Sequence, residues 1–213
     1  FKIAARYCPL ARYAAVASDL QEPFIEKSLL NPIEHSSPHG FLGESLARAG
    51  LSPEGFIWCP SEEVPEPFKA LLVHQGDMTS TLERFYEERM LLEVLAEENS
   101  DGCYSREVIL KGKGTGRAAE FGVIEMELDN FPPALQKLIL RGEQPLGGIL
   151  NESGMTYKSE PLGYFSVARE ALPPKLSLLG SAGMFFGRYN QLKTHDETCL
   201  ARILEIVPDF HHP

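Results

Sequence analysis

The sequence predicts an α+β fold in which a six-stranded antiparallel sheet carries helices on one face. Two observations lead to this prediction. Short segments with an apolar residue at every second position, as in half-buried strands, form one group before residue 129 and another after residue 160. A helical segment separates the two groups, and the connections within each group are short, as in hairpins. Strands arranged in this way pair with their neighbours along the chain, so the sheet is expected to be antiparallel.

Residues 66–210 are expected to form this domain, and residues 1–65 an N-terminal extension of uncertain role. The extension contains an Ala-rich segment, Ile3–Ser18, and a loop rich in Pro and Ser, Asn31–Gly40. His35 and His39 have the spacing of helical zinc ligands, but the prolines around them argue against a helix. We therefore expect no metal site there.

The first half of the predicted domain contains two helices and three strands. Asp77-Met78-Thr79 is expected to form a turn and a helix start, with a capped helix beginning at Thr79 to Glu83, and Asn99–Gly102 has the composition of a hairpin turn. Gly112–Gly116 resembles a phosphate-binding loop, but it lies between two strands rather than before a helix, so a hairpin loop is expected. The predicted elements are helices at Pro67–His74 and Thr79–Glu87 and strands at Arg89–Glu98, Cys103–Leu110 and Ala118–Leu128.

The second half contains a helix, a short helical turn and three more strands. Prolines at the start of the helix and Gly142 after it are typical of helix boundaries. A Gly- and Ser-containing segment, Leu176–Gly183, is expected to be a loop at the edge of a lid. The predicted elements are helices at Pro132–Arg141 and Pro145–Leu150 and strands at Pro161–Arg169, Met184–Leu192 and Thr198–Val207.

Composition and charge restrict the function. The net charge of −10 argues against nucleic acid or an anionic membrane as the main partner. No apolar run reaches membrane-spanning length. The four cysteines are far apart and form no CxxC pair, which is typical of free thiols in a reducing compartment. We expect a cytoplasmic protein with a small-molecule ligand and neither cofactor nor metal; its oligomeric state is left open.

Charged residues on apolar strand rows are the strongest functional signal. Arg106 shares its row with Tyr104, Val108 and Leu110, and Glu205 has a similar position on the last strand. A guanidinium on a row that faces the core costs several kcal/mol of folding free energy unless an anion meets it. That anion is either a carboxylate of the protein or a bound ligand.

Six short strings resemble the chorismate pyruvate-lyase family and occur in the family's order between about residues 66 and 208. The strings are Gly76-Asp77-Met78-Thr79, Tyr104–Leu110, Leu135-Gln136-Lys137-Leu138, Pro145-Leu146-Gly147, Phe186-Gly187-Arg188, and Leu204-Glu205 ahead of Pro208. The resemblance implies a six-stranded antiparallel sheet that closes over a buried site. It implies a carbon–oxygen lyase that eliminates pyruvate from chorismate to give 4-hydroxybenzoate without a cofactor.

The same resemblance implies site residues. Met78, Arg106, Leu146 and Glu205 correspond to residues that line the family's pocket. Arg106 would hold a substrate carboxylate, and Glu205 would transfer a proton or bind the ring hydroxyl, which makes these two the candidate catalytic residues. Met78 and Leu146 would shape an apolar slot for the ring.

Two positions depart from the family pattern. Active lyases have Arg where this chain has Gly148, and a second Arg where it has Glu120. Arg188 is on an inward row and is the candidate to supply the second cation instead. Three hypotheses therefore stand: a lyase, a non-catalytic domain that binds an aromatic carboxylate, and a structural protein in which Arg106 pairs with Glu120 or Glu205.

Overall fold

A computed structural model describes residues 43–209 of the chain. The expectations for Ile3–Ser18, Asn31–Gly40, His35 and His39 lie outside the described residues. In the part of the chain that is described, no helix is long and apolar enough to cross a membrane.

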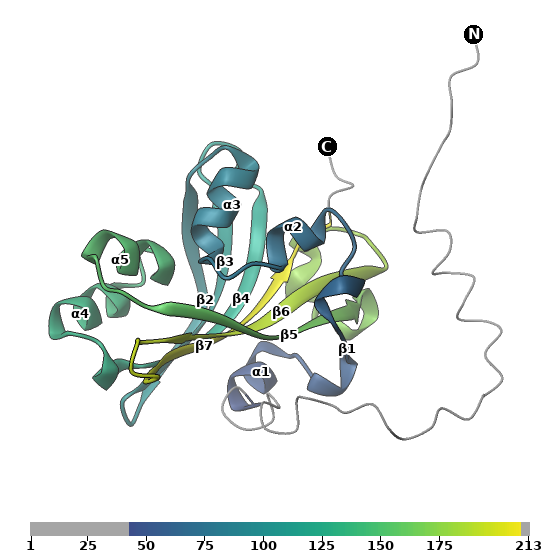
Figure 1. Cartoon of the computed structure of the whole chain (residues 1–213). Helices are drawn as coiled ribbons and strands as arrows, with labels where there is room; N and C mark the ends of the chain where they lie inside the picture. Colours follow the sequence, from purple (N-terminus) through teal and green to yellow (C-terminus); the bar gives the residue numbers. More distant parts are fainter. Residues whose placement is uncertain (1–42, 210–213) are drawn as a thin grey trace, which may run out of the picture. The chain divides into compact units, whose positions relative to one another are not determined.

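A single antiparallel sheet dominates the structure, in the order β1-β5-β6-β7-β4-β3-β2 (Figure 1). The α+β class and the antiparallel sheet are confirmed, but the sheet has seven strands instead of six. The additional strand pairs with β5 at one edge. The strands are β1 (Phe56–Cys59), β2 (Met90–Ser100), β3 (Cys103–Gly112), β4 (Ala118–Glu127), β5 (Lys158–Ala168), β6 (Met184–Lys193) and β7 (Cys199–Val207).

The additional strand has a physical explanation. β1 is four residues long, too short for alternation to stand out, and it is stabilised by packing: Phe56 stacks on Phe165 of β5 with ring centroids 4.5 Å apart. Both β1 and helix α1 precede residue 66, so residues on both sides of the predicted domain boundary contribute to this sheet and its core.

Helices cover both faces of the sheet (Figure 1). Four of them pack on the face to which the even-numbered side chains of β3 and β4 point, whereas α1 and a 3-10 helix at Pro174–Leu179 pack on the opposite face. That 3-10 helix takes up the first four residues of the predicted loop Leu176–Gly183, because Leu176 and Leu179 are buried in the core. The helices are α1 (Gly43–Ala49), α2 (Phe68–Leu72), α3 (Met78–Tyr86), α4 (Pro133–Arg141) and α5 (Leu146–Ser153).

Local sequence signals account for several boundaries. Asp101 and Gly102 both have positive φ, 51° and 81°, as a two-residue hairpin turn requires, and they join β2 to β3. The loop between β3 and β4 is the hairpin connection that the sequence predicts. The backbone N–H groups of Gly114 and Thr115 donate to the carboxylate of Glu88, at 2.7 and 3.1 Å.

The helical face carries two apolar clusters rather than one. Leu82 of α3 packs with Leu110 in one cluster, and Ile149 of α5 packs with Ile124 in the other. The two clusters meet over the middle of the sheet, between the starts of α3 and α5. This junction is where the candidate site lies.

Gly187 of β6 lies opposite Phe165 in the register of the sheet, and the ring covers the glycine. A Cβ atom at Gly187 would lie 2.3 Å from Cζ of Phe165 and 2.3 Å from the backbone oxygen of Glu205. We expect Gly187→Ala to lower the free energy of unfolding by about 1–3 kcal/mol, because both neighbours must move. Urea denaturation followed by circular dichroism measures this change.

Gly148→Ala is the matched control. A Cβ atom there meets nothing within 4 Å, and Gly148 lies in the first turn of α5. We expect its free energy of unfolding to be unchanged or higher by up to about 1 kcal/mol, because Ala favours the helix. Equal destabilisation by the two substitutions would contradict the packing argument.

Candidate functional site

A cavity of about 60 Å³ lies between the sheet and the starts of α3 and α5. Most of its wall is apolar, with side chains from both clusters of the helical face. The sequence analysis selected six site residues, and five of them line this cavity. They are Met78, Arg106, Glu120, Leu146 and Glu205.

Arg106 is buried, with 3% of its surface exposed, as its place on an apolar row predicts. Its Nη2 atom donates to the backbone oxygen of Gln144 at 3.4 Å, which is a long hydrogen bond. Its Nε and Nη1 atoms have no hydrogen-bond partner among residues 43–209, and the side chain forms no ion pair with any of them. Burial lowers the pKa of Arg106, but a guanidinium stays charged at neutral pH. The cavity wall therefore carries a cation with free donors.

Glu205 is paired, and its partner is Arg188 rather than Arg106. Arg188 lies opposite Glu205 in the β6–β7 register, and its Nε atom donates to the Glu205 carboxylate. Both side chains are almost completely buried, so the pair is shielded from water and neutral as a unit. Arg188 does not line the cavity, and its positive charge is balanced by the carboxylate of Glu205.

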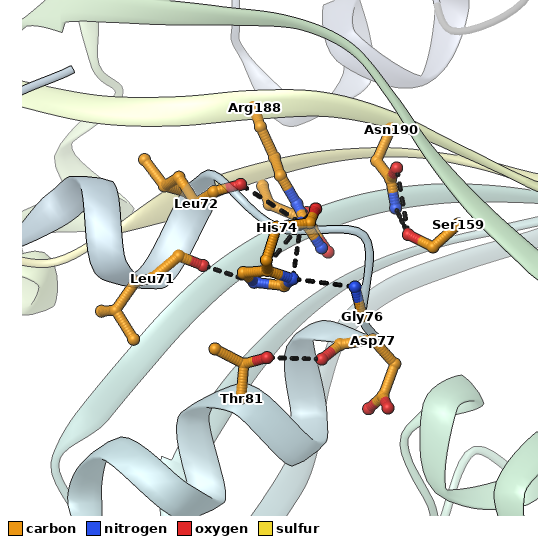
Figure 2. A network of polar contacts seen from close by, with 10 residues as sticks. Leu71, Leu72, His74, Gly76, Asp77, Thr81, Ser159, Arg188 and Asn190 are labelled. Carbon is orange, nitrogen blue, oxygen red and sulfur yellow. Dashed lines mark hydrogen bonds and ion pairs between the residues drawn. The ribbon is translucent and has the colours of Figure 1, made fainter. Parts of the chain in front are cut away.

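The end of α2 and the segment that follows it bind the Nη1 atom of the Arg188 guanidinium (Figure 2). The Nη1 atom of Arg188 donates to the backbone oxygens of Leu72 and His74, each at 3.3 Å. The His74 ring lies between two backbone groups: Gly76 N–H donates to Nδ1 at 3.1 Å, so the proton is on Nε2, which donates to the Leu71 oxygen at 2.7 Å. Burial, and then the charge of Arg188, lowers the pKa of His74 to about 4. His74 is therefore neutral at pH 7.

Glu120 is the second carboxyl group on the cavity wall and has 4% of its surface exposed. Its Oε2 atom has no hydrogen-bond partner among the described residues. Burial first, and the nearby charge of Glu205 second, raise the pKa of Glu120 well above its ordinary value, although Arg188 opposes this effect. Burial therefore favours the protonated form of Glu120.

Two helix N-termini converge on the cavity. Asp77 caps α3 by accepting from Ser80 N–H at 2.7 Å, whereas no side chain caps α5. Asn151, in the second half of α5, donates to Asp77 at 3.1 Å and so connects α5 to the start of α3. Gly147 permits this approach, because a Cβ atom there would lie 2.8 Å from Asp77 Oδ1. The unpaired N–H groups of an uncapped first turn favour an anion.

Two polar residues of the site, one on the cavity wall and one that binds Arg106, were not predicted from the sequence. Asn190 is buried, lines the cavity and donates to Ser159 Oγ at 3.0 Å. It lies two residues after Arg188 on the same strand, so alternation would have found it. Gln144 was missed because it contributes a backbone oxygen, for which the sequence contains no signal. Among residues 43–209, no group of three or more His, Cys, Asp or Glu side chains is placed to hold a metal ion.

Comparisons with known proteins give a distant similarity of fold. No protein-family model matches the chain, and no curated protein matches it significantly. The chain is similar to PhnF from Mycobacterium smegmatis, with 10% identity and a TM-score of 0.48 over 66% of this chain and 67% of that chain. It is also similar to the effector domain of the same protein, with 11% identity and a TM-score of 0.46 over 64% and 90%. Neither similarity is strong enough to indicate a ligand.

The neutral state of His74 predicts a pH dependence of stability. Its pKa is about 4 in the folded protein and about 6.5 in the unfolded chain, so the unfolded chain binds more protons between these values. The stabilisation that His74 contributes is complete above pH 6.5 and is lost as the pH falls toward 4. We expect the free energy of unfolding to decrease over this interval, and to decrease less in His74→Gln. Urea denaturation at pH 7, 6, 5 and 4 measures both proteins.

The difference between the two proteins isolates His74, because the carboxylates that titrate in the same interval are common to both. Parallel pH curves for the wild type and His74→Gln would contradict a neutral His74.

Proposed function

We propose that this domain binds a small carboxylate ligand, without catalysing a reaction, in the cavity between α3 and α5. The observation that carries the proposal is the unpaired guanidinium of Arg106 on the cavity wall. A buried guanidinium without an ion-pair partner is costly, and a carboxylate that accepts from one of its free donors would reduce this cost. The structural hypothesis, in which Arg106 pairs with Glu120 or Glu205, has no support among the described contacts.

The rest of the wall suits such a ligand. The uncapped start of α5 adds N–H groups on the side of the cavity opposite the sheet. Aliphatic side chains, among them Met78, Val108 and Leu146, would contact the apolar body of the ligand. An aromatic monocarboxylate such as 4-hydroxybenzoate combines these properties.

The cavity is smaller than the roughly 150 Å³ that holds a benzene ring, so the starts of α3 and α5 must separate when an aromatic ligand binds. Its volume of about 60 Å³ is below the roughly 300–1,000 Å³ of pockets that hold drug-sized molecules. A surface groove of about 540 Å³ shares Thr79 and Pro145 with the cavity. We infer that the ligand enters between Thr79 at the start of α3 and Pro145 at the start of α5.

Two features of the site favour binding over lyase catalysis: the pairing of Glu205 and the lack of a second cation on the cavity wall. Glu205, the candidate proton-transfer residue, is occupied by Arg188. A dianion such as chorismate would need a second cation, but Arg106 is the cation of the cavity wall among the described residues. Incubation with chorismate is therefore expected to release no pyruvate above the rate without protein. Release of pyruvate from chorismate above the rate without protein would support the lyase hypothesis instead.

Arg106→Ala tests the proposal directly. We expect the dissociation constant for 4-hydroxybenzoate to rise at least tenfold, which is about 1.4 kcal/mol or more, because the charged donors are lost. Isothermal titration calorimetry on the full chain measures the affinity, and circular dichroism confirms that the variant is folded.

Lys111→Ala is the matched control. Lys111 is on the same strand, and its ammonium group pairs with Glu93 away from the cavity, so this variant loses the same net charge without touching the site. We expect its affinity to equal that of the wild type. If folded Arg106→Ala binds 4-hydroxybenzoate as tightly as the wild type does, Arg106 does not contact the ligand.

A further inference from the structure

Glu120 and Glu205 meet on the cavity wall above a glycine. Gly122 lies opposite Glu205 in the β4–β7 register, and Glu120 is two residues before Gly122 on the same face. The Glu120 side chain leans across this glycine, because a Cβ atom at Gly122 would lie 3.1 Å from Glu120 Oε1. The absence of a side chain at Gly122 thus lets the Glu120 carboxyl group extend toward Glu205.

The charges around Glu120 come from four other elements. Arg106 of β3, Asp77 of α3 and Glu205 of β7 line the same cavity, and Arg188 of β6 lies behind Glu205. Arg188 and Glu205 neutralise each other, and Asp77 is used by Ser80 and Asn151. Of the two neighbouring carboxyl groups, Glu205 has a cation and Glu120 has none of its own, so burial favours the protonated form of Glu120.

A protonated carboxyl group has one O–H donor, and the Oε2 atom of Glu120 is buried without a partner among the described residues. We propose that Glu120 determines the specificity of the cavity: its neutral carboxyl group donates a hydrogen bond to an uncharged oxygen of the ligand, so the site selects monocarboxylates over dicarboxylates. This inference rests on the proposed function, because it assumes that Arg106 binds the carboxylate of the ligand.

Selection against a dicarboxylate follows from the same geometry. With one carboxylate on Arg106, a second carboxylate at the far end of the ligand would lie beside Glu120 and Glu205. It would lose its water without gaining a cation, which is unfavourable in a buried cavity. An uncharged oxygen at the same place loses far less hydration and gains the Glu120 hydrogen bond.

Three para-substituted benzoates of nearly equal shape test this inference. 4-Vinylbenzoate has no oxygen at the far end, 4-formylbenzoate has an uncharged acceptor, and terephthalate has a carboxylate. By calorimetry at pH 7 we expect the wild type to bind 4-formylbenzoate about threefold or more tightly than 4-vinylbenzoate, as a net hydrogen bond provides. We expect terephthalate to bind at least about tenfold more weakly than 4-formylbenzoate.

Two variants assign these preferences to Glu120. Glu120→Gln keeps an uncharged donor and is expected to retain the preference for the formyl over the vinyl compound. Glu120→Met removes the donor at similar volume and is expected to bind these two compounds equally. Glu125→Gln is the matched control, because Glu125 is on the same strand, faces α1 through Ser45 and does not line the cavity; its affinities should equal those of the wild type.

The outcomes separate this inference from the proposed function. If the wild type binds 4-vinylbenzoate and 4-formylbenzoate equally, or terephthalate as tightly as either, the role of Glu120 is wrong while binding at Arg106 stands. Loss of the formyl preference in folded Glu120→Gln would also overturn it. If the wild type binds none of the three compounds, the proposed function fails as well.

Discussion

The buried guanidinium of Arg106 is the constraint on which the site depends. Two of its nitrogen donors face a cavity and have no partner in the described part of the chain. Such an arrangement costs folding free energy, so the surrounding structure must hold it in place. The strand that carries Arg106 is central enough to do so, because β3 pairs along its length with β2 and β4. Binding of an anion to Arg106 would recover part of this folding free energy.

The other buried charges are arranged so that none of them forms an ion pair with Arg106 among the described residues. Arg188 takes the charge of Glu205, and the backbone oxygens of Leu72 and His74 take further donors of Arg188. His74 stays neutral because burial and the charge of Arg188 lower its pKa to about 4, which avoids a second positive charge beside Arg188. Burial favours the protonated, neutral form of Glu120. Arg106 is the cation on the cavity wall among the described residues.

The helical cover of the cavity combines rigidity with access. Asp77, Asn151 and Gly147 bring the starts of α3 and α5 into close contact, which closes the cavity above the sheet. The groove beside Thr79 and Pro145 lies where these two helix starts border the surface. Gly148 lines this groove and has open space around it, so the absence of a large side chain there is not imposed by packing. The same contact between helices thus defines the cavity and its entrance.

Alternation along single strands, which is a local property, was enough to predict the antiparallel α+β class, the six longer strands, and the inward direction of Arg106, Glu120 and Glu205. Tertiary structure alone decided which charges meet, because partners are set by the register between strands: Arg188 lies opposite Glu205, and this pairing leaves Arg106 free. It also decided that the short segment Phe56–Cys59 becomes a strand, since packing against Phe165 rather than its own pattern stabilises it. Local periodicity determines where a side chain points, whereas its partner depends on segments far away in the chain.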